Sequence, residues 1–324
     1  YHTHFDATHQ QDRGLYGPLI ILPAQEPNPP DREYTLVFSS WVTGQRATVP
    51  APGSGMMGGG MMGGTMGNGG PAYDTFTVNG KAFPATAPLA FQQGERVRLR
   101  LINASGERTH LIALEGHRLR VTHTDGNALQ RPVEVDVVPI APAERYDVEF
   151  VADRPGVWSL HDLAPGQTEA GLRVHVVYTG HEGDPEAPLR TDAAGLESWS
   201  YALGAGVDWL ARATGATRDF DLQLSGGMMG STAWTINGKV YPATDPLLVR
   251  QEDLVRVSLL NMSMEDHPFH LHGHSFRLTA IGGQTLAAPL IKDVVDVQPM
   301  ERASFEFVAD NPGAWMLHCH KPMH

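Results

Sequence analysis

The chain has a single cysteine among its 324 residues, few basic side chains and no long apolar run. One cysteine excludes an internal disulfide, so cysteine usage does not report the redox compartment. Only 24 Lys and Arg residues stand against 36 Asp and Glu, and the net charge of −12 argues against nucleic acid or an anionic membrane surface as a partner. No apolar stretch approaches the ~20 residues that a transmembrane helix requires. We therefore expect neither nucleic-acid nor membrane partners.

Glycine and proline are abundant instead, with 35 and 24 residues, and segments rich in Val, Leu and Phe recur between them. The alternating segments at 96–103 and 302–308 are typical of half-buried strands, and Gly, Pro and Asn turns separate such segments. This pattern, with only 19% charged residues, predicts an all-β protein. The length is sufficient for two or three domains, each with a core of its own.

The sequence also repeats itself. Residues 78–86 (VNGKAFPAT) match residues 236–244 (INGKVYPAT), and the sequence EFVAD occurs at both 149–153 and 306–310. A repeat of this length indicates a duplicated domain, because solenoid repeats are much shorter. Each copy is predicted to be a Greek-key β-sandwich.

Histidine is concentrated in two segments, 267–274 (HPFHLHGH) and 318–324 (HCHKPMH), and the second contains the only cysteine. A further pair, His2 and His4, stands at the start. Thiolate and imidazole are the ligands that soft or borderline transition metals select. A cysteine near histidine can also be a nucleophile, but a nucleophile needs one base and gains nothing from repeated alternating histidines. Copper is favoured, because structural zinc sites usually contain several cysteines.

The spacing within these segments predicts two metal centres rather than one. Successive side chains of a strand point to opposite faces, so Cys319 projects one way while His318 and His320 project the other. The same rule separates His267 from His270 and His272, which therefore need not bind the same metal. One tripeptide can then contact two neighbouring centres.

These motifs resemble those of the multicopper oxidase family, which includes laccases and cuprous oxidases. The family has four copper-binding motifs, HxHG, HxH, HPxHLHG and HCHxxxH, and an axial Met or Leu follows the last. This sequence contains the second, third and fourth motifs, lacks the first and stops at His324, before the axial residue. The resemblance therefore implies a fragment of a protein with three cupredoxin domains. Its parts would be the C-terminal remnant of domain 1 at 1–30, with a final strand at 14–21, domain 2 at 31–182 and domain 3 at 183–324.

Domain 2 is expected to bind no copper. In the repeat, His110 aligns with His267, but Ala113 and Glu115 align with His270 and His272, and the segment 161–163 (HDL) aligns with 318–320 (HCH). The histidines outside the motifs are expected to be surface or hydrogen-bonded residues: His9, His110, His117, His123, His161, His175 and His181. Glu265 and Asp266 directly precede the third motif and are candidates for orienting ligands or relaying protons, although solvated carboxylates are the commoner outcome.

The resemblance implies a role for each ligand. The type 1 copper, which accepts electrons from the substrate, would be held by His267, Cys319 and His324. The type 2 copper would be held in part by His270. One type 3 copper would bind His4, His272 and His318, and the other would bind His2 and His320. A complete enzyme would contain four copper ions, with Cys319, His318 and His320 as the catalytic route for electrons between the two centres.

The predicted function is that of a laccase-like oxidase, which couples one-electron oxidation of phenols, aromatic amines or Cu(I) to the reduction of dioxygen to water. The resemblance also implies a periplasmic or secreted location. Two alternatives stay open at this point: a copper nitrite reductase, and a copper-resistance protein that binds cuprous ion with little turnover. The sequence does not indicate the oligomeric state.

A segment rich in methionine and glycine occupies residues 51–70, and a shorter echo lies at 226–230. Thioether sulfur is a soft ligand that favours Cu(I), so this segment is a candidate for collecting cuprous ion. The alternative is a low-complexity linker without a function of its own. The candidate ligands are Met56, Met57, Met61, Met62 and Met66.

Overall fold

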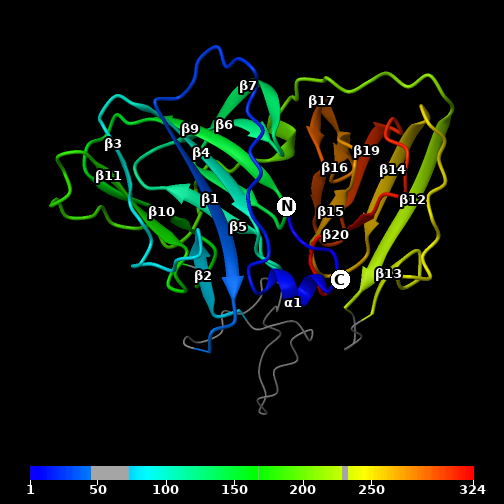
Figure 1. The fold of residues 1–324 in the computed structure, drawn as a ribbon, viewed down its shortest axis with the longest axis horizontal. Coiled ribbons are helices and arrows are strands. Elements are labelled where there is room, and N and C mark those ends of the chain that lie inside the picture. Colours follow the sequence, from blue (N-terminus) through cyan, green and yellow to red (C-terminus); the bar gives the residue numbers. More distant parts are fainter. Residues whose placement is uncertain (45–72, 167, 228–232) are drawn as a thin grey trace. The chain divides into compact units, whose positions relative to one another are not determined.

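The computed structural model of the protein describes residues 1–44, 73–166, 168–227 and 233–324 (Figure 1). The predicted all-β class is confirmed, since helical structure in these ranges is limited to α1 (Ala7–Gln11) and the short 3₁₀ helix η1 (Tyr201–Leu203). The chain divides into two compact units, of which the first contains the described residues up to Leu203 and the second begins at Gly204. Neither helix in the described part of the chain has the length or apolarity needed to cross a membrane.

The first unit is built from two β-sheets. One has the strand order β2-β1-β4-β9-β6-β7 and the other the order β3-β11-β10-β5-β8. Apolar side chains of β4 alternate into the core, where Val97, Leu99 and Leu101 are fully buried. The strands are β1 (Arg32–Trp41), β2 (Thr75–Val78), β3 (Leu89–Phe91), β4 (Arg96–Asn103), β5 (His110–Leu114), β6 (Leu119–Thr124), β7 (Asn127–Val135), β8 (Val137–Ile140), β9 (Arg145–Val151), β10 (Val157–Asp162) and β11 (Arg173–Tyr178).

The second unit has a six-stranded sheet in the order β13-β12-β14-β19-β16-β17 and a three-stranded sheet in the order β18-β15-β20. Figure 1 shows β15 and β20 side by side within this unit. The strands are β12 (Thr217–Gly226), β13 (Trp234–Ile236), β14 (Leu254–Asn261), β15 (His267–Leu271), β16 (Phe276–Ile281), β17 (Gln284–Lys292), β18 (Val294–Val297), β19 (Arg302–Val308) and β20 (Leu317–Cys319).

The sequence repeat is visible as a repeat of topology. The two six-stranded sheets have the same strand order, and the pairing of β6 with β9 shifts register at the same place as the pairing of β16 with β19. The Asn-Gly dipeptides at 79–80 and 237–238 both have positive φ at both residues, which is the conformation of the tight hairpin turn that this dipeptide favours. The duplicated local sequence therefore forms duplicated local structure.

The predicted strand at residues 14–21 is wrong. In the described part of the chain, this segment forms no strand ladder. Only Tyr16 pairs, through an isolated bridge with His2.

The segment after residue 182, where the domain boundary was predicted, belongs to the first unit by its contacts. Glu186 forms an ion pair with Arg173, and the ring of Trp199 lies edge-on against Tyr146 at a centroid distance of 6.0 Å. The three-part division implied by the family stays a prediction.

Candidate metal centres

The pairing of β15 with β20 decides where the motif side chains point. Phe269 lies directly opposite Cys319, and His270 lies directly opposite His318. Residues opposite one another in an antiparallel pair share a face, and neighbours along a strand alternate between faces. Cys319 is therefore on the face of His267, and His318 is on the face of His270.

Three candidate ligands, two imidazoles and one cysteine sulfur, meet on the first face. The candidate ligand atoms of His267, Cys319 and His324 all lie within 4.8 Å of one another. The Sγ atom of Cys319 is 3.5 Å from Nδ1 of His324, which is 3.2 Å from Nδ1 of His267. We refer to these three residues as the cysteine centre.

Hydrogen bonds at the far side of each ring turn these Nδ1 atoms inward. Nε2 of His267 is 3.0 Å from the hydroxyl of Ser263, and Nε2 of His324 donates to a carboxylate oxygen of Glu265 at 3.3 Å. Such outer partners fix the tautomer and the orientation of a ligating imidazole. Glu265 is thus a residue that orients a candidate ligand, as considered from the sequence.

Burial favours the neutral form of both imidazoles. Removal from water lowers the pKa of His267 to about 3, and the charges of His324 and Lys321 act in the same direction. Burial also lowers the pKa of His324, although the hydrogen bond to Glu265 opposes this shift. A neutral imidazole is the form that binds metal, so a thiolate with two neutral imidazoles fits a blue-copper site.

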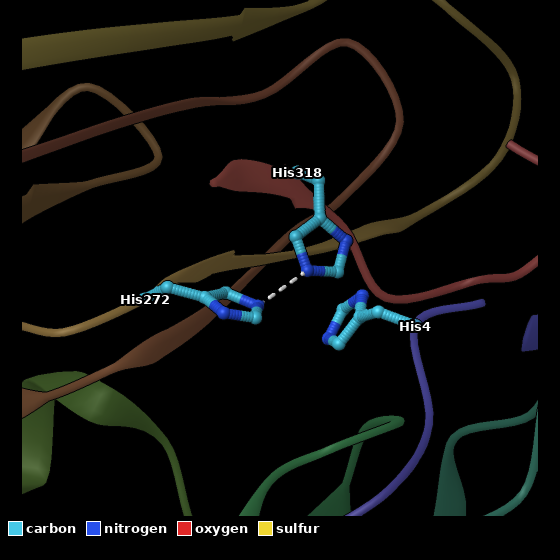
Figure 2. Close-up of side chains that lie close together, drawn as sticks. All are labelled: His4, His272 and His318. Carbon is cyan, nitrogen blue, oxygen red and sulfur yellow. Dashed lines mark hydrogen bonds between the residues drawn. The ribbon is translucent and has the colours of Figure 1, made fainter. Parts of the chain in front are cut away.

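The opposite face carries four histidines, which we call the histidine cluster: His270, His272, His318 and His320. The ring centroids of His270 lie 4.7 Å from those of His272 and 5.8 Å from those of both His318 and His320. His318 and His272 point toward one another in Figure 2, with 3.0 Å between their Nε2 atoms. His270 and His318 donate from Nδ1 to the carbonyl oxygens of Asp293 and Cys319, which directs Nε2 of each ring to the cluster. Four imidazoles so arranged fit copper better than a hard cation.

An ion pair ties the segment after Cys319 to the segment before β15. The ammonium group of Lys321 lies 2.7 Å from Asp266 and 4.0 Å from Glu265, and Lys321 is only 4% exposed. Asp266 therefore binds a buried cation and is not a solvated loop carboxylate.

Comparison with known proteins agrees with this donor set. Two family models, both described as multicopper oxidase, match residues 32–180 and 214–324. The chain belongs to the multicopper oxidase family. Members of this family bind copper, with four ions in a complete enzyme.

The relatives of this multicopper oxidase chain are longer proteins. It is 34% identical to the multicopper oxidase MmcO of Mycobacterium tuberculosis, covering 97% of the chain and 64% of that protein. It is 25% identical to the iron transport multicopper oxidase fio1 of Schizosaccharomyces pombe, covering all of the chain and 58% of that protein. The chain thus spans less than two thirds of the length of these relatives. The crystal structure of a laccase from Botrytis aclada has the same fold, with a TM-score of 0.73 at 21% identity over 100% of this chain and 67% of that one.

One residue at the cysteine centre was not found from the sequence. The indole of Trp234 stacks on the ring of His324 at a centroid distance of 3.8 Å and 29°, and it meets the ring of His267 edge-on at 5.2 Å and 77°. The sequence repeat does point to Trp234, because this residue aligns with the aromatic Phe76. The ring of Phe76 lies edge-on to His110 at 5.9 Å and 84°.

The first unit replaces the ligands by hydrogen-bonded pairs at the aligned positions. Asp162 stands where the other copy has Cys319, and its carboxylate lies 2.6 Å from Nδ1 of His110. Glu115 stands where the other copy has His272, and it lies 2.9 Å from Nε2 of His161. The expectation that His110 and His161 are hydrogen-bonded residues is thus met, although both are fully buried. Carboxylates paired in this way offer no soft ligand, in line with a copper-free domain.

His2 and His4 lie in the first unit with ring centroids 4.7 Å apart, and Nε2 of the Gln11 amide is 2.8 Å from Nδ1 of His2. Their sharing of copper with residues of the second unit stays a prediction. The methionines of the Met- and Gly-rich segment lie outside the described residues: Met56, Met57, Met61, Met62 and Met66.

Proposed function

We propose that the chain is the copper-binding part of a laccase-like multicopper oxidase that takes electrons singly from a reductant and delivers them to dioxygen. In this proposal the cysteine centre holds the type 1 copper. His270 binds the type 2 copper, and the type 3 pair is held by His272 and His318 with His4, and by His320 with His2. Copper bound at these two places would supply one-electron redox chemistry and the reduction of dioxygen.

The observation that carries the proposal is the register of β15 and β20. It places the thiolate of Cys319 on one face and the imidazole of His318 on the other, while both side chains belong to adjacent residues. A few covalent bonds of the backbone then join the two candidate centres, with a further link in the hydrogen bond from His318 Nδ1 to the Cys319 carbonyl. This continuity supports the assignment of the tripeptide as the electron route.

The remaining side chains hold the ligands in place. Glu265 and Ser263 keep the Nδ1 atoms of His324 and His267 directed at the sulfur, and the pair of Lys321 with Asp266 anchors the segment that carries His324. The histidine cluster favours an oxidase over a nitrite reductase, because paired histidines on both strands suit a multinuclear site better than a single catalytic copper.

The reductant and the location are proposed at a coarser level. Relatives of this chain include proteins named laccase and iron transport multicopper oxidase, which supports a phenol, an aromatic amine or a metal ion such as Cu(I) as the electron donor. A periplasmic or secreted location, and a role of the Met- and Gly-rich segment in collecting Cu(I), stay predictions.

Cys319→Ser tests the assignment. Serine removes the only soft anionic donor but leaves every imidazole in place, so the copper-loaded variant should lose the intense visible thiolate-to-copper absorption and all turnover of an aromatic reductant. Copper bound by the histidine cluster, measured by metal analysis and electron paramagnetic resonance, should remain. Retention of the visible band in the variant would refute the type 1 assignment.

A further inference from the structure

We infer that Trp234 is a positioning residue of the cysteine centre, one that holds His324 in the orientation a metal requires. The inference rests on the proposed function, because it treats His324 as a ligand. The indole lies face-to-face with the His324 ring at 3.8 Å and edge-on to the His267 ring at 5.2 Å, so one side chain contacts both imidazoles of the centre.

His324 needs such support more than its two partners do. His267 and Cys319 belong to the paired strands β15 and β20, whose ladder fixes their backbones. His324 lies beyond β20, in a turn where its backbone N–H donates to the carbonyl of Lys321 at 3.0 Å. The orientation of its ring is therefore set by side chains.

Two groups fix that ring from different directions. Trp234 covers one face, while Glu265 accepts a hydrogen bond from Nε2, and the side chain of His324 is only 3% exposed as a result. The hydrogen bond allows rotation about its own axis, which the stacked indole blocks. Together the two contacts direct Nδ1 at Cys319 and His267 before any metal binds.

A glycine in the neighbouring strand β12 leaves room for the indole of Trp234. Gly226 of β12 pairs with Trp234 of β13, and a Cβ atom on Gly226 would lie 2.5 Å from Cε3 of the indole and 2.6 Å from the carbonyl oxygen of Ala233. Contacts this short are not tolerated, so only glycine permits Trp234 to lie where it does.

The duplicated unit separates the two roles of the ring. Phe76 occupies the aligned position in the first unit and makes the edge-on contact with His110, the counterpart of His267. The edge-on contact therefore occurs in both copies. The stacked contact with the ring of His324 is made in the copy that carries the cysteine. Trp234→Phe consequently mimics the copper-free copy.

The test is a titration of the 324-residue chain with Co(II), followed by the thiolate-to-cobalt absorption. Because Cys319 is the only cysteine, this band reports the cysteine centre alone. Removal of an outer-shell contact typically weakens metal affinity about 10- to 100-fold. We expect Trp234→Leu, which lacks both ring contacts, to weaken Co(II) binding about tenfold or more, and Trp234→Phe to weaken it by a smaller factor of about three. Both variants should shift or broaden the band.

Trp315→Phe is the matched control. Trp315 also packs against a glycine of the second unit, Gly273, but its ring partner is His274, at 6.3 Å. This variant should bind Co(II) with the affinity and the spectrum of the parent. A second readout is tryptophan emission: the parent and Trp315→Phe should lose a component on binding Cu(II) that Trp234→Phe no longer has.

The outcomes separate the two proposals. If the parent shows the cobalt band and both Trp234 variants bind with its affinity and spectrum, the inference on Trp234 is wrong and the proposed function stands. If the parent shows no thiolate-to-cobalt band, the cysteine centre itself is misassigned and both fall. Should Trp234→Leu fail to fold, as judged by far-ultraviolet circular dichroism, Trp234→Phe decides alone, since phenylalanine already occupies this position in the other copy.

Discussion

Removal of the Asp162 carboxylate should strongly destabilise the first unit. The Asp162 carboxylate lies 2.6 Å from Nδ1 of His110 with both side chains at 0% exposure, and Nε2 of His110 lies 2.7 Å from the hydroxyl of Ser105. The other carboxylate oxygen of Asp162 accepts hydrogen bonds from the backbone N–H groups of Leu111 and Ala164, both at 2.8 Å. In Asp162→Ala, one imidazole nitrogen and two backbone donors would be left in the core without this acceptor.

The magnitude follows from that count. Each buried donor left without its acceptor typically costs about 1–3 kcal/mol, and the costs of the three donors overlap in part. We therefore expect Asp162→Ala to lower the free energy of unfolding of the first unit by about 4–5 kcal/mol. Asp162→Asn retains one carbonyl acceptor and should cost about 2–3 kcal/mol.

The assay is urea unfolding of the metal-free chain, followed by circular dichroism and tryptophan emission. The two units require separate transitions in the fit, because a chain with two compact units need not unfold in one step. Asp245→Ala is the control: its ion pair with Lys239 is exposed, with 71% and 46% of the two side chains accessible, and should contribute about 0–1 kcal/mol. If Asp162→Ala lowers the free energy of unfolding no more than this control does, the pair of Asp162 and His110 does not stabilise the first unit as we propose.

Two further predictions concern residues that lie next to the ends of strands, Asp74 before β2 and Gly273 after β15. Burial would raise the pKa of Asp74, but hydrogen bonds from Thr43, Thr75 and Gly44 outweigh it and lower the pKa from 3.8 to about 2. The carboxylate thus contributes stability above about pH 4 that is lost as the pH falls toward 2, and in Asp74→Asn the difference in urea midpoint from the parent should shrink over this range. Gly273 has a φ of +69°, and a Cβ there would lie 2.5 Å from Cδ2 of Trp315, so Gly273→Ala should lower the thermal midpoint of the second unit by several degrees in calorimetry. An unchanged midpoint would show that the indole moves aside freely.

The parts of the fold that the sequence predicted are those with a local cause. The strands at 96–103 and 302–308 coincide with β4 and β19, because period-two alternation is a property of the chain itself. The separation of Cys319 from His318 follows from the same alternation and needs no tertiary information. The prediction of a strand at residues 14–21 was wrong. An apolar segment forms a strand only where a neighbouring strand pairs with it, and here only Tyr16 forms an isolated bridge.

The parts that could not be predicted depend on contacts between distant segments. Trp234 reaches His324 only because β13 pairs with β12 at Gly226, a register that no local pattern specifies. Ser263 is close to His267 in sequence, yet its contact with Nε2 depends on the turn that Asn261 holds together by accepting the backbone N–H of Ser263. The candidate metal ligands can thus be predicted from the sequence, whereas the side chains that orient those ligands cannot.

The two copies show two ways of linking the same pair of strands. In the first unit, β5 and β10 are joined by carboxylate–imidazole pairs, in which each acceptor meets a donor and the protein alone satisfies the contact. In the second unit, β15 and β20 and the residues that follow them bring imidazole nitrogens close together, 3.0 Å apart between His272 and His318 and 3.2 Å apart between His267 and His324. Two such nitrogens can share one proton or one metal cation, and the low pKa of His267 disfavours added protons there. Under the proposed function, a cation with affinity for imidazole and thiolate would link these side chains, whereas in the other copy the aspartate at the position of Cys319 pairs directly with His110.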